Sequence, residues 1–211
     1  VVFEGWDAAG KGTTIATLTQ RLDPRGFKLY PVTEPRTYEQ QRPWLWRFWL
    51  KIPAYGQMVI FDGSWYRRVL IDRVMKTVAK RDWERAYHDI AEFEEQLAND
   101  GTLIVKFWLH ISEKEQGKRF KKLLRDELTA WRVSDEDAFQ HKAYDRYLEA
   151  AEEMLARTDA PYAPWTLVAA TDRYYTRLTV YETLIRALEL RLGPLAAPDE
   201  ADQPAAESAH A

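Results

Sequence analysis

The sequence predicts an α/β fold in which helices flank a parallel β-sheet. Short apolar runs alternate with longer amphipathic segments along all 211 residues, which is the pattern of a doubly wound sheet. The apolar runs are nearly continuous, as in strands buried on both faces. A composition of 46% hydrophobic and 13% aromatic residues excludes disordered, collagen-like and coiled-coil chains. The chain is long enough for one large domain.

Five apolar runs are predicted to be strands of one sheet. They are Val1–Phe3, Leu29–Thr33, Met58–Phe61, Leu103–Leu109 and Thr166–Ala170. Six helical patterns follow them: Lys11–Leu22, Trp65–Val78, Trp83–Asn99, Lys114–Leu124, Asp135–Arg157 and Arg173–Leu192. Ligands of such sheets bind beyond the carboxyl ends of the strands, so the loops that follow the strands are where we expect a site.

Several classes of protein are excluded by composition. The chain has no Cys, so disulfides, thiolate metal sites and Cys nucleophiles are absent, and its four scattered His have no ligand spacing. The longest apolar stretch, residues 44–52, is interrupted by Arg47 and Lys51 and is shorter than the roughly 20 residues of a membrane span. We therefore expect no membrane segment and a cytoplasmic protein.

The last eighteen residues differ from the rest of the chain. Residues 194–211 carry four acidic side chains and no Lys or Arg, so of the net charge of −3 this tail holds −4 and the remainder +1. The tail is Pro-rich and lacks aromatic residues, which predicts disorder. We expect one domain over residues 1–193 and a disordered acidic tail over 194–211. Because the chain opens inside an apolar run, we also expect it to be a fragment.

A glycine-rich loop follows the first predicted strand. Residues 5–11, GWDAAGK, fit the pattern G-x-x-x-x-G-K between a strand and a helix, which is typical of a phosphate-binding loop. Its backbone N–H groups, the helix N-terminus and Lys11 would all attract phosphate oxygens. The alternative is a Gly-rich turn before a helix. A dinucleotide site is disfavoured because Ile15 stands where a third Gly is expected.

Two aspartates are candidate Mg²⁺ ligands. Residue 12 is Gly, where a Ser or Thr ordinarily binds Mg²⁺ in P-loop proteins. Asp7 instead lies inside the loop, where it would repel phosphate unless a cation stood between them. Asp62 ends the strand 58–61, the usual place of a second Mg²⁺ carboxylate. For each aspartate the alternative is a helix-capping or loop role.

Basic residues gather at two places. The first group follows Asp62: Arg67, Arg68 and Arg73. The second falls at helical offsets 0, 3, 4 and 7 and forms one face of a predicted helix: Lys118, Lys121, Lys122 and Arg125. This face suits a polyanion, and the alternative is a solvated surface. No aromatic-rich RNA motif accompanies it, so we expect no nucleic-acid partner.

Several long motifs resemble the polyphosphate kinase 2 family, in the family's order, over residues 1–190. They are VVFEGWDAAGKG, LWRFW, IFDGSWYRRVLIDRV, FEEQLANDGTLIVKFWLHIS, EQGKRF and APWTLVAATDRYYTRL. Within the family, PWLWRFW, SWYRRVL and APWTLV together are most similar to the catalytic domain of polyphosphate:AMP phosphotransferases. Those proteins usually carry two tandem kinase-like domains, which implies a tandem domain or a homo-oligomer as partner.

The resemblance implies a thymidylate-kinase-like P-loop kinase fold with a helical lid at about 113–137. It implies Mg²⁺-dependent phosphoryl transfer between inorganic polyphosphate and a nucleotide, with AMP converted to ADP. The implied catalytic residues are Asp7, Lys11, Asp62 and Arg68, with Mg²⁺ at Asp7 and Asp62. The implied phosphate-binding residues are Ala8, Ala9, Gly10, Lys11, Gly12 and Thr13. The resemblance adds Arg119 and Arg132 to the basic face, so the lid residues that we expect to bind polyphosphate are Lys118, Arg119, Lys121, Lys122, Arg125 and Arg132.

The chain departs from the family pattern at three positions. Gly63 stands where the family has Arg, and Leu123 and Thr129 stand where it usually has Arg and Lys. Loss of an Arg beside a transferring phosphate lowers the rate by several powers of ten in other systems. Three alternatives therefore stay open: a polyphosphate-dependent nucleoside diphosphate kinase, an ATP-dependent nucleoside monophosphate kinase, and a non-catalytic domain that binds nucleotide or polyphosphate.

Overall fold

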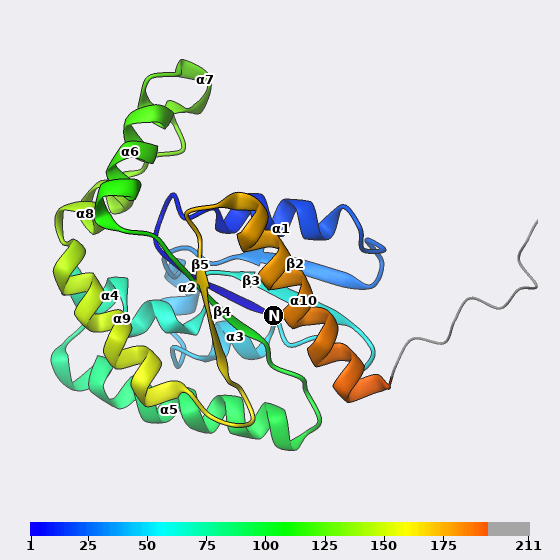
Figure 1. Cartoon of the computed structure of the whole chain (residues 1–211). Coiled ribbons are helices and arrows are strands. Elements are labelled where there is room, and N and C mark those ends of the chain that lie inside the picture. Colours follow the sequence, from blue (N-terminus) through cyan, green and yellow to red (C-terminus); the bar gives the residue numbers. More distant parts are fainter. Residues whose placement is uncertain (194–211) are drawn as a thin grey trace, which may run out of the picture.

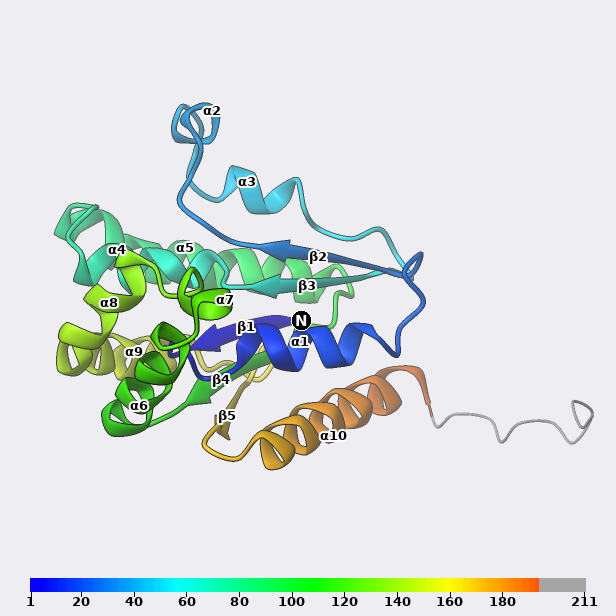
Figure 2. The ribbon, with the colours of Figure 1, turned by 90° about the horizontal axis from the view of Figure 1, so that it is seen from above.

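The computed structural model describes residues 1–193, and the predicted disordered tail lies outside these described residues. Five strands form one sheet in the order β2-β3-β1-β4-β5, and every pair of neighbours is parallel (Figures 1 and 2). The strands are β1 Val2–Gly5, β2 Phe27–Pro31, β3 Met58–Asp62, β4 Lys106–His110 and β5 Trp165–Ala169. The predicted α/β fold class is confirmed.

Helices cover both faces of this sheet. Their bounds are α1 Lys11–Thr19, α2 Thr37–Gln40, α3 Trp46–Trp49, the 3₁₀ helix η1 Trp65–Arg68, α4 Ile71–Val74, α5 Lys80–Asn99, α6 Glu113–Leu124, α7 Glu127–Ala130, α8 Asp135–Lys142, α9 Tyr144–Thr158 and α10 Arg173–Leu192. Helices α1 and α10 pack together on one face, and α4, α5 and α9 lie on the other (Figure 2). Helices α6 and α7 project beyond the sheet (Figure 1); together with α8 they contain the segment predicted to be a lid, and the name lid denotes these three helices below. Over residues 1–193, no helix combines the length and apolar character that a bilayer crossing requires.

The central strands β1, β3 and β4 are buried on both faces, as predicted, but the two edge strands are not. Leu29 of β2 is 43% exposed and Leu167 of β5 is 64% exposed. These strands lie at the margins of the sheet, where the flanking helices cover them incompletely. The prediction of complete burial was therefore wrong for β2 and β5, although both were correctly assigned as strands.

The ends of two strands are set by pairing rather than by hydrophobicity. The predicted strand 103–109 begins only at Lys106, which pairs with Val2. Lys106 is fully buried because its Nζ donates to Glu94 Oε2 at 2.7 Å and to the Tyr66 hydroxyl at 2.8 Å. The predicted strand 29–33 lies two residues earlier, at Phe27–Pro31, where its register is set by β3.

The helix predicted over Trp65–Val78 is wrong as a continuous element. It is divided into η1 and α4, because Leu70 adopts a non-helical conformation with φ −103° and ψ −100°. The Ser64 side chain accepts a hydrogen bond from the Tyr66 N–H at 3.2 Å, and the Trp65 and Tyr66 side chains enter the core. Burial of these two aromatic residues outweighs the local helical preference of the segment.

The helix predicted over Asp135–Arg157 is likewise two helices. Ala143, with φ −107° and ψ 25°, separates α8 from α9. The next residue, Tyr144, stacks on Trp6 of the glycine-rich loop with ring centroids 3.9 Å apart, and its hydroxyl donates to the Ile111 carbonyl at 2.9 Å. This tertiary contact fixes the bend, and helical periodicity carries no signal of it.

Candidate active site

The glycine-rich loop lies at the carboxyl edge of the sheet, between β1 and α1. Gly5, at φ +130°, closes β1 against β4, and a Cβ there would lie 2.3 Å from the Leu109 carbonyl oxygen, so only glycine fits. The first turn of α1 presents the N–H groups of Lys11, Gly12 and Thr13, which have no carbonyl partner within the helix. Such N–H groups at a helix N-terminus can bind an anion, which is the role that the sequence predicts for this loop.

Lys11 is held inside this loop. Its Nζ donates to the carbonyls of Gly5 at 2.9 Å and Trp6 at 3.1 Å and contacts Asp7 Oδ1 at 3.2 Å. Burial would lower the pKa of Lys11, but the carboxylates of Asp7, Asp62 and Glu4 offset that effect and raise the pKa overall. Lys11 therefore carries a positive charge at the loop.

The two aspartates predicted as metal ligands share this charged region. Asp62 Oδ2 would lie 3.8 Å from a Cβ built on Gly12, so the end of β3 faces the first turn of α1. Burial raises the pKa of both carboxyls, and the charge of Lys11 opposes the rise. A neighbouring carboxylate raises each pKa further: Asp137 acts on Asp7, and Asp7 acts on Asp62. Two hard oxygen donors that repel each other are a donor set that fits a divalent cation.

A larger metal cluster is absent from the described part of the chain. No group of three or more His, Asp or Glu side chains within residues 1–193 is arranged to hold a metal ion. Mg²⁺ commonly binds one or two carboxylates and completes its octahedron with phosphate oxygens and water. A pair such as Asp7 and Asp62 is therefore sufficient for Mg²⁺ beside phosphate, though not for a metal held by protein groups alone.

A third carboxyl, Glu4, also belongs to this region and was missed by the sequence analysis. Glu4 is 5% exposed and accepts a hydrogen bond from Ser64 Oγ at 2.7 Å. Burial raises its pKa to about 7, against the opposing effects of the Ser64 bond and of Lys11. The available signal was an acidic residue within an otherwise apolar strand, directly before the loop.

A cavity of about 290 Å³ is lined by Ser64 and by several arginine and aromatic side chains, with the carboxylates of Glu39 and Asp72 also in its wall. The arginine and aromatic side chains are Arg42, Arg47, Arg67, Arg68, Trp44, Phe48 and Trp65. The Arg68 guanidinium lies 5.7 Å from the centroid of the Trp44 ring, and within residues 1–193 the buried Nε of Arg68 has no hydrogen-bond partner. Cationic groups beside flat apolar rings suit a ligand that combines phosphate with an aromatic base.

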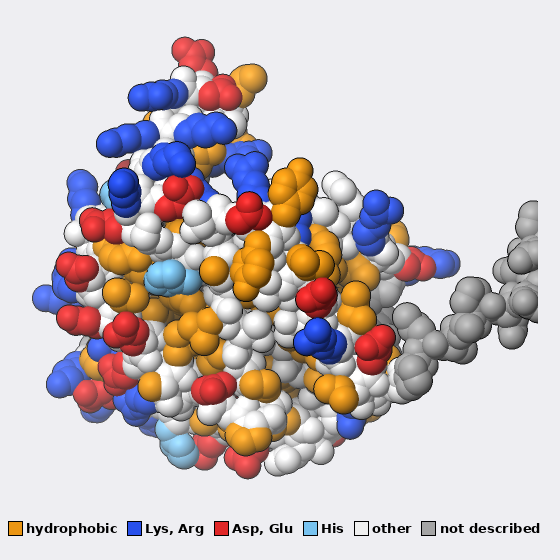
Figure 3. All heavy atoms as spheres, viewed as in Figure 1, with side chains coloured by type: hydrophobic (Ala, Val, Ile, Leu, Met, Phe, Trp, Pro, Cys, Tyr) orange, Lys and Arg blue, Asp and Glu red, His pale blue; other side chains and the backbone are white. Residues whose placement is uncertain are grey.

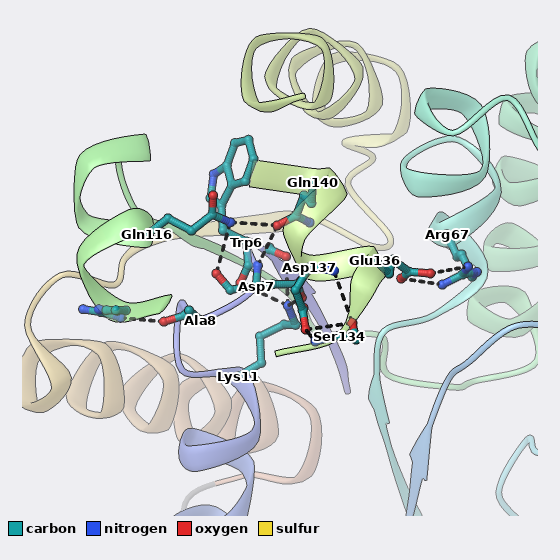
Figure 4. A network of polar contacts seen from close by, with 12 residues as sticks. Trp6, Asp7, Ala8, Lys11, Arg67, Gln116, Ser134, Glu136, Asp137 and Gln140 are labelled. Atoms are coloured by element: carbon teal, nitrogen blue, oxygen red, sulfur yellow. Dashed lines mark hydrogen bonds and ion pairs between the residues drawn. The ribbon is translucent and has the colours of Figure 1, made fainter. Parts of the chain in front are cut away.

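Arg67 serves a different purpose from its neighbour. Its two terminal nitrogens donate to Glu136 of α8 at 2.8 and 2.7 Å, and its Nε lies 3.0 Å from Asp72 Oδ1 (Figure 4). This bidentate pair fastens α8, at the base of the lid, to η1. Both arginines line the cavity, but the guanidinium of Arg67 is engaged in joining two elements, whereas that of Arg68 has no such ion pair within residues 1–193.

The basic residues predicted on the lid divide into two sets. Five are exposed, and basic side chains gather over the projecting lid in Figure 3. These five are Lys118, Lys121, Lys122, Arg125 and Arg132. They have the access to solvent that a polyanion-binding surface needs, although Lys118 Nζ also lies 3.4 Å from Glu115 Oε2.

Arg119 does not belong to this exposed surface. Its Nη1 donates to the carbonyls of Ala8 at 2.9 Å and Ala9 at 3.2 Å, and its Nη2 donates to those of Ala170 at 3.0 Å and Thr171 at 2.9 Å. Its Nε donates to Glu115 Oε1 at 2.9 Å. These contacts use all five N–H groups of a guanidinium. In this structure Arg119 joins α6 to the glycine-rich loop, and its predicted contact with polyphosphate stays a prediction.

Comparison with known proteins identifies the family of this chain. A family model described as Polyphosphate kinase 2 (PPK2) matches residues 1–193. A polyphosphate:AMP phosphotransferase from Pseudomonas aeruginosa is 44% identical over 188 residues, which cover 89% of this chain and 38% of that protein. An ADP-polyphosphate phosphotransferase from the same organism is 37% identical over 194 residues, covering 92% of this chain and 64% of that protein.

A solved structure has the same fold. The crystal structure of polyphosphate kinase 2 from Arthrobacter aurescens TC1 matches with a TM-score of 0.86 at 34% identity, covering 95% of this chain and 71% of that chain. The present chain spans about two fifths of the length of the polyphosphate:AMP phosphotransferase. The match over residues 1–193 and the shared architecture lead to one conclusion: the chain belongs to the polyphosphate kinase 2 family.

Proposed function

We propose that this chain catalyses Mg²⁺-dependent transfer of the terminal phosphoryl group of inorganic polyphosphate to AMP, which gives ADP. The observation that carries the proposal is the juxtaposition of Lys11, Asp7 and Asp62 at the glycine-rich loop. The family match and the 44% identity to a polyphosphate:AMP phosphotransferase support the choice of donor and acceptor.

The reaction requires positioning and charge neutralisation more than covalent help from the protein. An oxygen of the AMP phosphate attacks the terminal phosphorus of polyphosphate, a new P–O bond forms, and the bond to the shortened chain breaks. Lys11 and the N–H groups of the first turn of α1 hold the phosphoryl oxygens and offset their charge. Mg²⁺, held by Asp7 and Asp62, would neutralise the phosphates further when bound.

The two substrates are assigned to different surfaces. The cavity beside Ser64 takes the acceptor, with Arg68 at its phosphate and Trp44 beside its base. The exposed basic residues of the lid take the polyphosphate chain, because a flexible polyanion needs a row of accessible cations rather than a shaped pocket. Those residues are Lys118, Lys121, Lys122, Arg125 and Arg132.

A donor and acceptor screen tests this assignment. The protein is incubated with Mg²⁺, either polyphosphate or ATP, and either AMP or ADP, and the products are separated by anion-exchange chromatography. We expect ADP from polyphosphate and AMP, with slower reaction in the other combinations. Turnover with ATP alone would establish a nucleoside monophosphate kinase, and preference for ADP would establish a diphosphate kinase. Binding of AMP and polyphosphate without turnover would establish a non-catalytic domain.

A further inference from the structure

Both backbone polar groups of Asp7 are bound by glutamines of the lid (Figure 4). The Asp7 N–H donates to Gln140 Oε1 at 2.9 Å. Gln116 Nε2 donates to the Asp7 carbonyl at 3.2 Å and to Gln140 Oε1 at 2.8 Å. Gln116 lies in α6 and Gln140 in α8, so one residue of the glycine-rich loop is held by both helices that form the base of the lid.

Only one assignment of donors and acceptors satisfies this network. The Asp7 N–H can only donate, so the atom of Gln140 that faces it is the carbonyl oxygen. The atom of Gln116 that faces two acceptors must be its NH₂ group, which leaves Gln116 Oε1 as an acceptor. His141 Nδ1, 2.9 Å from that oxygen, must therefore carry a proton. Which group donates and which accepts is therefore fixed for every hydrogen bond that connects His141 to Asp7.

The network is buried and closely packed. Gln116 is fully buried and Gln140 is 2% exposed, so neither amide can exchange its partners for water at little cost. A Cβ added to Gly117 would lie 3.2 Å from His141 Cε1 and Nε2, and Phe120 meets the His141 ring edge-on at 5.8 Å. These contacts hold His141 in place behind Gln116. The glutamines therefore present a rigid surface to the loop.

This arrangement fixes the Asp7 main chain and leaves its carboxylate directed toward Lys11. The bonds connect residues 133 and 109 positions apart in the sequence, so they form only when α6 and α8 are docked on the loop. Undocking the lid would release both the N–H and the carbonyl of Asp7. The orientation of the proposed catalytic carboxylate is thus coupled to the position of the lid.

We propose that Gln116 and Gln140 are positioning residues that orient Asp7 when the lid is docked. The proposal rests on the proposed function, because it assigns these residues to the same phosphoryl transfer. Gln116 acts through its N–H donors and Gln140 through its carbonyl acceptor. The two glutamines therefore respond differently to one isosteric substitution.

The test compares Gln116→Glu with Gln140→Glu. Both variants conserve side-chain size and add the same charge, at two side chains that contact each other. A glutamate at 116 loses the hydrogen bonds that Gln116 donates, whereas a glutamate at 140 keeps an acceptor for the Asp7 N–H. Hydrogen exchange of the Asp7 amide, followed by NMR, is expected to accelerate at least tenfold in Gln116→Glu and less than threefold in Gln140→Glu. Gln116→Met, which cannot donate in any protonation state, should match Gln116→Glu. Gln57→Glu, exposed before β3, is the matched control.

Kinetics supply the second readout. The kcat of Gln116→Glu should be at least fivefold lower than that of Gln140→Glu, and the KM values of the two variants for AMP should differ less than threefold. Equal exchange rates in the two glutamate variants, or unchanged kcat in Gln116→Glu, would overturn the positioning role. If the wild type transfers no phosphate, the proposed function fails and the catalytic part of this inference falls with it, while the exchange comparison still decides whether the glutamines hold Asp7.

Discussion

Replacing Glu4 by Gln should change how the stability of the domain depends on pH. Burial raises the pKa of the Glu4 carboxyl from its ordinary value of 4.5 to about 7 in the folded protein. The folded state therefore binds a proton more tightly than the unfolded state. The corresponding stability is fully present below the unfolded pKa and is lost as pH rises through the folded value. At 1.36 kcal/mol per pKa unit, this effect makes the wild-type protein about 3 kcal/mol less stable at pH 8 than at a pH below 4.5.

Glu4→Gln cannot ionise and keeps an acceptor for Ser64 Oγ. We expect its advantage over wild type in the free energy of unfolding to grow by about 2–3 kcal/mol between pH 5 and pH 8. Urea titrations followed by tryptophan fluorescence at the two pH values measure this growth. Glu149→Gln, exposed on α9, is the control and should show no such growth. An advantage that is constant or shrinks with rising pH would refute the assignment of Glu4 as a buried carboxyl of raised pKa.

Three further predictions concern the loop, the lid and the position where the family Arg is replaced. Gly63 has φ +70°, a backbone conformation that strains any other residue, although a Cβ there would have room, 3.5 Å from the Val32 carbonyl oxygen. Gly63→Ala and Gly63→Arg should therefore both lose about 1–2 kcal/mol of stability in thermal unfolding. Single-turnover rates should nevertheless be higher for Gly63→Arg than for Gly63→Ala, and a lower rate would show that the added guanidinium crowds the site. Arg119→Lys, which has too few donors for the carbonyls it now binds, should lose about 1–3 kcal/mol in urea unfolding, and an unchanged midpoint would contradict its joining role. Lys121→Gln and Lys122→Gln should each weaken polyphosphate binding and reduce the slope of log affinity against log salt by about 0.7–0.9, and an unchanged slope in calorimetric titrations would remove the lid surface from the donor site.

The strands were predictable because their signal is local. A buried central strand such as Met58–Asp62 must be apolar along its whole length, and the glycine-rich loop has a spacing imposed by its own backbone. The bends at Leu70 and Ala143 were not predictable in this way. They depend on where Tyr66 and Tyr144 dock, and docking partners distant in sequence leave no periodicity in either segment.

The site was only partly predictable for the same reason. Lys11, Asp7 and Asp62 follow recognisable strand ends, so their meeting could be inferred from the topology of a parallel sheet. Gln116 and Gln140 are ordinary helical residues whose importance arises from folding two lid helices against one loop. Arg119 lies one residue from Lys118 in the basic segment, yet the turn of the helix directs it toward carbonyls rather than solvent.

The most direct measurement of the central claim is the rate of ADP formation by Asp7→Asn and Asp62→Asn across a Mg²⁺ titration. Each substitution keeps the shape of the side chain but removes one hard anionic oxygen donor, so we predict a loss of more than about a hundredfold in turnover. Asp7→Asn leaves the backbone bonds of residue 7 to Gln116 and Gln140 available, and circular dichroism should show both variants folded. Near-normal turnover in both folded variants would contradict the assignment of the two carboxylates to phosphoryl transfer.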